Sequence, residues 1–267
     1  MKRSTRGSLI DRGDEIKGRR IVLILVAAVG IGTAFLATTL LLAGCSSDIA
    51  ASLKADGGAR VAVQAEVPAA LAAKFRKLAQ ASSGEEVDAG VPLFDTEAIR
   101  KAAAERPWMR VASLSRPSPE SIKAEIEVLS LEKLAASKDL AGSGLLAVSR
   151  GAGWAELRIR LDRGCAAAAA KLFPGIDPYL MEALSPPALE EEPVTAAEYR
   201  TMLKSVLGEK AMPAMEAAAI SISLTAPGKV VESAGGSLEG GVLKARIPII
   251  DALVLERPIE IRLRWAQ

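Results

Sequence analysis

The stretch Ile259-Glu260-Ile261-Arg262-Leu263-Arg264-Trp265 alternates apolar with charged side chains. Residues 154–162 show the same pattern, with Leu157, Ile159 and Leu161 separated by arginines. Successive side chains of a β-strand point to opposite faces, so this alternation is typical of a strand with one face toward a core and one toward water. The two stretches therefore predict an antiparallel sheet that is solvated on one face.

Turn residues punctuate further strand-like segments. Arg150-Gly151-Ala152-Gly153 separates residues 145–149 from residues 154–162 in the manner of a β-hairpin. Ala226-Pro227-Gly228-Lys229 predicts a type II turn, because proline presets φ and glycine adopts a positive φ. Other strands are predicted over residues 59–67, 108–115, 122–130, 220–225, 230–231 and 242–247.

Helical periodicity occupies most of the remaining chain. Thr195 and Glu198 form a capping-box pattern that opens a helix to about Leu207. Other helices are predicted over residues 68–81, 96–105, 131–137, 164–184 (broken at Pro174-Gly175) and 212–218. We therefore predict a single α+β domain over residues 59–267, with helices packed on one face of the antiparallel sheet.

An N-terminal signal or transmembrane helix is predicted before this domain. Residues 21–44 contain no charged side chain, and as a helix they would be about 36 Å long, enough to cross a hydrocarbon core of about 30 Å. Residues 1–20 contain seven basic and three acidic side chains. This basic flank favours a cytoplasmic N-terminus and export of everything after residue 44. The net charge of +2 thus combines a basic leader with a slightly acidic remainder.

The apolar run ends in Leu42-Ala43-Gly44-Cys45, which resembles the lipobox of bacterial lipoproteins. The resemblance implies a signal peptide over residues 1–44, cleavage between Gly44 and Cys45, and diacylglyceryl and acyl chains such as palmitate on Cys45. Two or more acyl chains make a stable membrane anchor. The alternative is an uncleaved signal-anchor helix with an incidental cysteine. Residues 45–58 are then expected to be the lipidated cysteine and a short flexible tether.

The lipobox also implies a place in the cell. A lipid-anchored chain exported in this way belongs to the cell envelope, with the membrane as a partner. Ser46, rather than aspartate, follows the cysteine. By resemblance to the sorting rule of diderm bacteria, this favours the outer membrane over the exported face of the inner membrane.

The composition excludes several kinds of catalytic and binding site. The chain has no histidine and two cysteines, so it cannot form a Ser-His-Asp triad, a His-based zinc site or a Cys₄ zinc site. Its low net charge does not suggest nucleic acid as a partner, and its aromatic content of 3% disfavours stacking platforms. We predict no catalytic residue, no metal, no cofactor and no enzymatic activity.

Four short patterns could carry chemistry, and each has a plainer interpretation. Ser130 to Lys133 fits the S-x-x-K pattern of penicillin-binding enzymes, but its companion motifs are absent, so a helix start is favoured. Gly142 to Ala147 fits G-x-G-x-x-A but precedes a predicted strand instead of a helix. Cys165 is expected to be a small buried helix residue, with a reactive thiol as the alternative. The acidic residues Asp162, Asp177 and Glu182 are expected to be solvated charges.

The C-terminal part of the sequence resembles the LppM-type bacterial lipoproteins. The resemblance rests on Cys45 and on residues 220–265, in which Leu224 to Val231 contains a Pro-Gly hairpin followed by a Gly-rich turn and further strands. It implies an envelope α+β domain that handles lipid.

Two roles are therefore expected for the exported domain. The first is a structural or protein-interaction role, through a sheet edge or through the acidic loop of residues 185–193. The alternative is the binding of a lipid or another apolar ligand by the apolar face of the sheet.

Overall fold

The computed structural model describes residues 46–83, 90–170, 172, 184, 186–189 and 194–267. The predicted signal helix and Cys45 lie outside this part of the chain. The described residues form a mixed α+β structure with two β-sheets. The α+β prediction is confirmed, whereas the prediction of one sheet is wrong.

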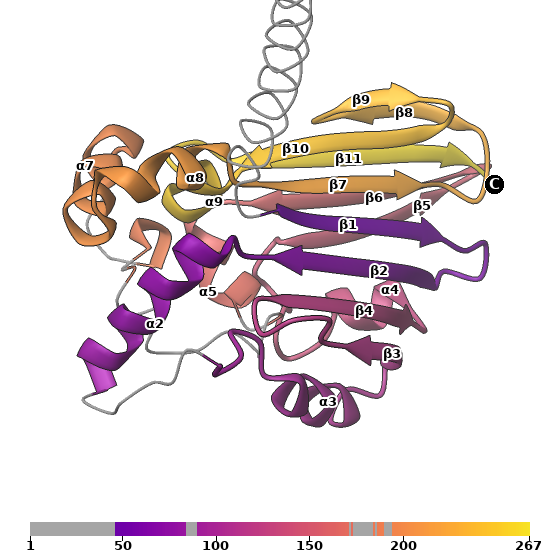
Figure 1. Ribbon diagram of the computed structural model, residues 1–267. Helices are drawn as coiled ribbons and strands as arrows, with labels where there is room; N and C mark the ends of the chain where they lie inside the picture. The colour runs from indigo at the N-terminus through magenta and orange to yellow at the C-terminus, as the bar shows by residue number, and fades with distance from the viewer. Residues whose placement is uncertain (1–45, 84–89, 171, 173–183, 185, 190–193) are drawn as a thin grey trace, which may run out of the picture. The chain divides into compact units, whose positions relative to one another are not determined.

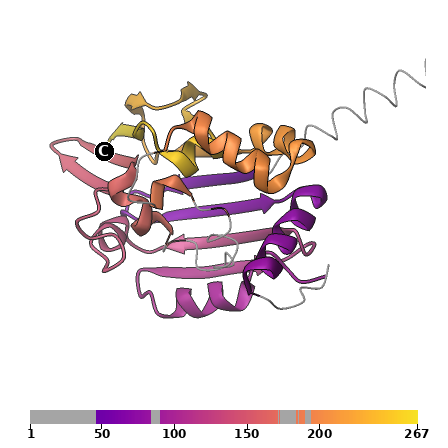
Figure 2. The ribbon, with the colours of Figure 1, turned by 90° about the vertical axis from the view of Figure 1, so that its left-hand side faces the viewer.

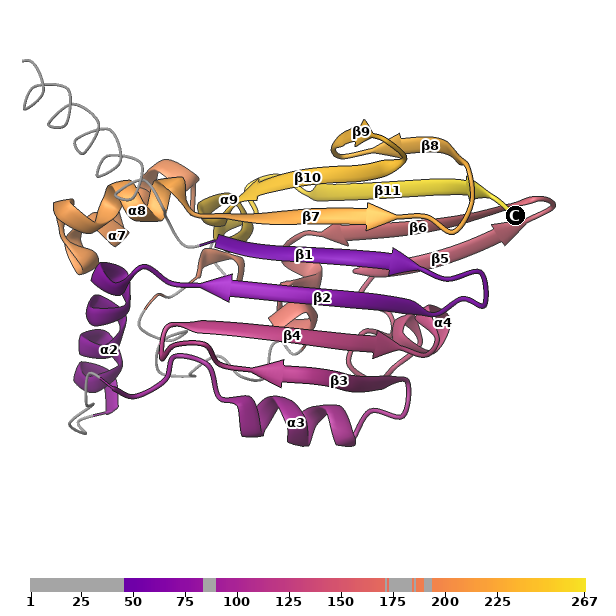
Figure 3. The same ribbon diagram turned by 45° about the vertical axis from the view of Figure 1, so that its right-hand side comes forward.

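The larger sheet has seven strands in the order β3-β4-β2-β1-β7-β10-β9 (Figure 3). All of its neighbouring pairs are antiparallel except β1 and β7, which run parallel. It is therefore a mixed sheet, contrary to the antiparallel prediction. Its strands are β1 (Ser46–Leu53), β2 (Ala59–Glu66), β3 (Met109–Ser115), β4 (Ser121–Val128), β7 (Ala219–Thr225), β9 (Ser237–Glu239) and β10 (Val242–Pro248).

The smaller sheet has the order β5-β6-β11-β8 and is antiparallel throughout. Its strands are β5 (Leu146–Gly151), β6 (Trp154–Leu161), β8 (Val230–Ala234) and β11 (Ile259–Ala266). Gly151 pairs with Trp154, which confirms the predicted hairpin. Ile261, Leu263 and Trp265 of β11 are buried, which confirms that their alternation marks a core-facing side.

The two sheets share the main hydrophobic core. The larger sheet contributes Leu53, Leu224 and Leu243 to it, and the smaller sheet contributes Leu263 and Trp265. The apolar face of each sheet is thus covered largely by the other sheet. The prediction that helices cover one face is therefore wrong for this core, because apolar alternation identifies a buried face but does not identify what buries it.

A pair of glycines links the sheets. Gly235 and Gly236 lie between β8 of the smaller sheet and β9 of the larger one, so one bent segment contributes a strand to each. A Cβ on Gly235 would lie 2.0 Å from the carbonyl oxygen of Glu260, and one on Gly236 would lie 2.2 Å from that of Lys244. Only glycine permits so close a passage between two backbones, and such bends are how strands switch sheets.

Most helices gather at one end of the strands (Figures 1 and 2). Four of them share a second core, in which Leu71, Tyr199, Leu203 and Val254 are fully buried or nearly so. These are α2 (Ala69–Ser83), α7 (Ala196–Leu207), α8 (Met212–Ala217) and α9 (Ile249–Val254). We call this part of the molecule the helical end. The C-terminus lies at the opposite end of the strands (Figure 1).

Shorter elements complete the described structure. Thr195 and Glu198 cap α7 with both hydrogen bonds of a capping box, as predicted. The predicted helix over residues 164–184 is described mainly over α5, and its Pro174-Gly175 break lies outside the described residues. The remaining elements are α3 (Thr96–Ala104), α4 (Leu131–Ala135), α5 (Arg163–Ala170) and the 3₁₀ turns η1 (Pro187–Leu189) and η2 (Glu209–Ala211).

The predicted tether is wrong for residues 46–53, which form β1. This strand lies inside the larger sheet, paired with β2 on one side and β7 on the other. The alternation of this strand is weak in the sequence, because its inward residues include Ala51 beside Ile49 and Leu53, and its other residues are small or polar. Alanine and aspartate have low strand propensity, so pairing on both sides and burial of Ala51 and Leu53 stabilise this segment as a strand.

Candidate functional site

Cys45 and Gly44, the predicted lipidation and cleavage site, lie outside the described residues. The first described residue, Ser46, is already the first residue of β1. It pairs with Glu66 of β2 and Ala219 of β7. Within the described ranges, no helix combines the length and apolarity needed to span a membrane.

The outer side of the smaller sheet carries a dense set of charges. Because Ile261, Leu263 and Trp265 face the core, the residues between them on β11 point outward, and their partners on β6 and β8 do the same. We call this set the charged face. It consists of Glu156, Arg158, Arg160, Glu232, Glu260, Arg262 and Arg264.

Arg264 is the most tightly held member of the charged face. Its Nη2 lies 2.6 Å from Oε2 of Glu156, and its Nη1 lies 2.8 Å from Oε2 of Glu232. Its guanidinium carbon lies 4.7 Å from the centre of the Trp154 ring. Two carboxylates and an aromatic ring therefore fix this arginine, which leaves little capacity for an outside ligand.

Arg158 and Arg262 form the unbalanced part of the charged face. They are direct cross-strand partners on β6 and β11. Arg262 donates to Glu232, and its Nε is buried without an acceptor in the described part of the chain. The Arg158 side chain is exposed, and the described residues provide it with no acceptor. Like charges opposite each other destabilise a sheet. Arg158 therefore presents unused donors beside a second arginine.

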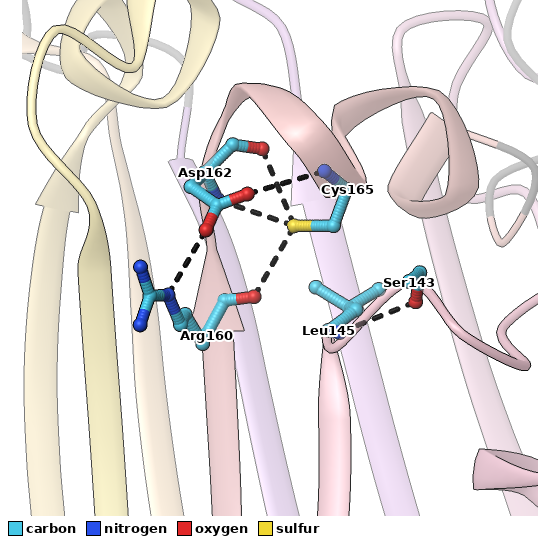
Figure 4. Close-up of polar contacts among 5 residues, drawn as sticks. All are labelled: Ser143, Leu145, Arg160, Asp162 and Cys165. Carbon is cyan, nitrogen blue, oxygen red and sulfur yellow. Dashed lines mark hydrogen bonds and ion pairs between the residues drawn. The ribbon is translucent and has the colours of Figure 1, made fainter.

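Cys165 lies at the junction of β6 and α5 (Figure 4). Its Sγ is 3.1 Å from the backbone nitrogen of Asp162 and 3.2 Å from the carbonyl oxygen of Arg160. In return, the Cys165 N–H donates to Oδ1 of Asp162 at 3.2 Å, while Arg160 Nε donates to Oδ2 at 2.9 Å. The thiol thus takes part in a reciprocal cap at the first turn of α5, resembling a capping box.

The chemistry of Cys165 is that of a structural residue. The side chain is 1% exposed and packs against Leu140 and Leu145, and the turn leading to Leu145 is held by Ser143 Oγ (Figure 4). Burial raises the pKa of the Cys165 thiol, so the nucleophilic thiolate is disfavoured. The prediction of a small buried helix residue is confirmed.

The Asp162 carboxylate is stabilised in its charged form. Burial raises its pKa, but the hydrogen bonds from Arg160 and from the Cys165 N–H lower it by more, so the pKa of Asp162 lies below its ordinary value. Asp162 is therefore an ion-paired helix cap and not a solvated charge as predicted. Asp177 and Glu182 lie outside the described residues.

The other sequence patterns have structural roles. The Ser130 side chain accepts a hydrogen bond from Lys133 N and caps α4, which confirms a helix start in place of a catalytic S-x-x-K. The Gly142 to Ala147 pattern leads into β5, as expected. The described residues contain no cluster of three or more potential metal ligands.

The described surface includes shallow hollows among the helices and at the edge of the larger sheet. One lies between α3 and β3 and is bordered by Arg100, Arg106 and Met109. A second lies between α7 and α8, with Arg200, Lys204 and Glu216 on its rim. In the second hollow, the Thr201 hydroxyl donates to the carbonyl oxygen of Ala197 within α7.

No protein-family model matches this chain, and no curated protein matches it. Among solved structures, the chain is similar to the NMR structure of the folded domain of LppM from Mycobacterium tuberculosis. The TM-score is 0.38 and the sequence identity is 11%, over 84% of this chain and 91% of that chain. A similarity this low transfers neither a fold nor a function.

Proposed function

We propose that this chain is a non-enzymatic lipoprotein of the bacterial cell envelope, anchored by acyl chains on Cys45, which binds a protein partner through its charged face. The lipobox pattern supports the anchor. The observation that supports the binding role is the Arg158–Arg262 pair, because these two arginines lie side by side on a rigid sheet with donors that the described residues do not use.

The chemistry of the pair indicates the kind of partner. Arginine presents a planar fork of donors that matches a carboxylate in a bidentate arrangement. A carboxylate placed beside Arg158 would bind its exposed guanidinium and relieve its repulsion with Arg262. The partner is therefore an acidic segment of another envelope protein.

The alternative, binding of lipid or another apolar ligand, has less support. It needs an apolar space, and the region between the sheets is occupied by buried side chains such as Leu243, Leu263 and Trp265. Native mass spectrometry of the exported domain separates the two roles. A bound species of defined mass that organic extraction removes would favour the alternative.

The anchor is tested by the intact mass of the purified protein. A mature chain that begins at Cys45 and carries acyl chains is expected. A Cys45→Ala variant should remain an unprocessed precursor, and normal maturation of that variant would disprove the lipoprotein assignment.

The binding surface is tested by photo-crosslinking in intact cells. A photo-reactive amino acid replaces the exposed Glu260 on the charged face and is expected to capture a protein neighbour. Adding Arg158→Glu should lower the crosslinking yield about tenfold or more, since a charge-assisted hydrogen bond contributes roughly 1.5–3 kcal/mol.

The matched control is Lys123→Glu, which reverses an exposed charge on β4 of the other sheet. It should leave the yield unchanged. A yield insensitive to Arg158→Glu, or equally sensitive to Lys123→Glu, would show that the charged face is not the binding surface.

A further inference from the structure

The absence of a tether constrains how an anchored domain can stand on a membrane. Cys45 is joined directly to Ser46, which already occupies its place in the larger sheet opposite Glu66 and Ala219. One residue spans at most about 3.6 Å of extended chain. A lipid on Cys45 therefore holds this end of β1 at the bilayer surface.

The elements around Ser46 belong to the helical end. Its partner Ala219 begins β7 directly after α8, and its partner Glu66 ends β2 just before α2. The strand β10 ends at Pro248, opposite Ala219, and continues into α9. Three of the four helices of this end are thus connected to strand ends that lie beside the attachment point (Figures 1 and 3).

The opposite end of β1 is far from the attachment point. The strand runs for eight residues to Leu53 and then turns at residues 54–58 back into β2. At about 3.3 Å per residue, this turn lies roughly 25 Å from Ser46 along the strand direction. The domain therefore has one end close to the anchor and one end roughly 25 Å away along the strand direction.

Basic side chains that can contact lipid headgroups lie mainly on α2 of the helical end. In α2, Lys74 and Lys77 are exposed, and the helix contains no acidic residue. Arg200, Lys204 and Lys210 add exposed basic groups on α7 and η2. The exposed acidic residues of α7, η2, α8 and α9 are Glu198, Glu209, Glu216 and Asp251. A basic side chain near an anionic membrane contributes about 1 kcal/mol to binding.

We propose that the helical end is the membrane-facing surface of the domain and lies against the lipid headgroups, while the turn at residues 54–58 points away from the bilayer. This inference rests on the proposed lipid attachment at Cys45. It adds an orientation to that function. The position of Ser46 in β1 keeps this end of the domain at the bilayer, and the basic side chains of α2 can contact the headgroups.

The test measures the height of two positions above the bilayer. The full-length lipidated protein is reconstituted into vesicles of phosphatidylethanolamine and phosphatidylglycerol that carry a nitroxide quencher on the headgroup. A fluorophore is attached through Glu216→Cys on α8 or through Ala55→Cys in the far turn, both exposed positions. Cys165 is buried, so it does not compete for the label.

Quenching is expected to be about threefold or more stronger at position 216 than at position 55, because the two positions differ in height by roughly 25 Å. Equal quenching, or stronger quenching at position 55, would overturn the proposed orientation. Weak quenching at both positions would do the same, since it means that a second copy or another protein separates the helical end from the lipid.

A linker variant examines the cause of the orientation. Twelve glycine and serine residues inserted between Cys45 and Ser46 span about 20 Å and free the domain to rotate. A smaller difference between the two positions in this variant supports the short attachment as the cause. A retained difference also supports the proposal, with the surface of the helical end as the cause.

Vesicle flotation and intact mass distinguish a failure of the lipid anchor from a failure of the proposed orientation. Protein that floats free of the vesicles, or whose mass lacks acyl chains, contradicts the proposed lipoprotein function before any height is measured. Anchored protein with the wrong height profile contradicts only the orientation.

Discussion

At the scale of single residues, the link between the two sheets depends on Gly235. Its φ is +82°, and an added Cβ would meet the carbonyl oxygen of Glu260 at 2.0 Å. Gly241 has the same φ of +82° but nothing within 4 Å of an added Cβ. The two glycines share a backbone conformation and differ in their surroundings.

We therefore expect Gly235→Ala to lower the free energy of unfolding by roughly 3 kcal/mol or more, because a backbone clash is added to the strain of positive φ. Gly241→Ala should cost about 1 kcal/mol, from the φ strain alone. Urea denaturation of the two variants measures both values. Equal losses of unfolding free energy in the two variants would show that the close approach of Gly235 to β11 does not constrain the segment that joins the two sheets.

The ion pair between Asp162 and Arg160 gives a second prediction, on pH. Because the pKa of Asp162 is lowered in the folded protein, its stabilising effect is present above the ordinary pKa of aspartate, near 3.9, and is lost as the pH falls through the lowered value. Asp162→Asn keeps the cap on Cys165 N but removes the charge. Its free energy of unfolding should decline less between about pH 4 and pH 2 than that of the parent protein.

The same pair can be broken from its other side. Arg160→Gln removes the donor that lowers the pKa of Asp162 most strongly. The free energy of unfolding of this variant should therefore also decline less at acid pH than that of the parent protein. Urea unfolding at a series of pH values gives the slopes. Unchanged slopes in both variants would contradict the structural role of this ion pair.

At the scale of elements, β1 decides where the domain begins. The strand forms ladders with both β2 and β7 and contributes Ala51 and Leu53 to the main core. Removing it would expose two unpaired strand edges in the interior of the sheet. We expect a chain of residues 59–267 to lose cooperative unfolding, whereas residues 46–267 keep it. Circular dichroism during thermal unfolding distinguishes them, and equally cooperative curves would restore residues 46–58 as a dispensable tether.

The sequence predicted elements better than it predicted their partners. The sequence predicts the strand at residues 259–265 and the Thr195–Glu198 capping box, because each depends on residues that are close together in the chain. The strand at residues 46–53 is not predicted, because its strand propensity is weak and one of its two partners, β7, lies about 170 residues away in the sequence. Local propensity is weak in such a segment, and the sheet overrides it.

The sequence predicts which residues of the charged face point outward, but not how they pair across the strands. Arg158 and Arg160, like Arg262 and Arg264, could be assigned to an outward side from their alternation. The register between β6 and β11 could not be predicted from the sequence. This register places Arg158 opposite Arg262 and Arg264 opposite Glu156. A one-residue slip would reverse which side faces the core, so burial of Leu263 and Trp265 is what fixes the positions of the arginines.

At the scale of the whole molecule, the order of strands ties the two sheets into one cooperative structure. The segment from β7 to β11 passes from the larger sheet to the smaller one at β8, returns to the larger one at β9 and β10, and ends in the smaller one. Neither sheet can separate without disrupting the core cluster to which both contribute.

We therefore expect both sheets to unfold in a single transition. Variants that keep one tryptophan, with the other two replaced by phenylalanine, report on each sheet separately. Trp108 lies just before β3 of the larger sheet, and Trp265 lies in β11 of the smaller one; both are buried. Because unfolding of either sheet exposes the shared core, each variant's fluorescence and circular dichroism should give the same midpoint in urea. If instead the Trp265 fluorescence changed at a distinct urea concentration from the circular dichroism signal of the same variant, the smaller sheet would be an independent unit and the Gly235–Gly236 link only a hinge between them.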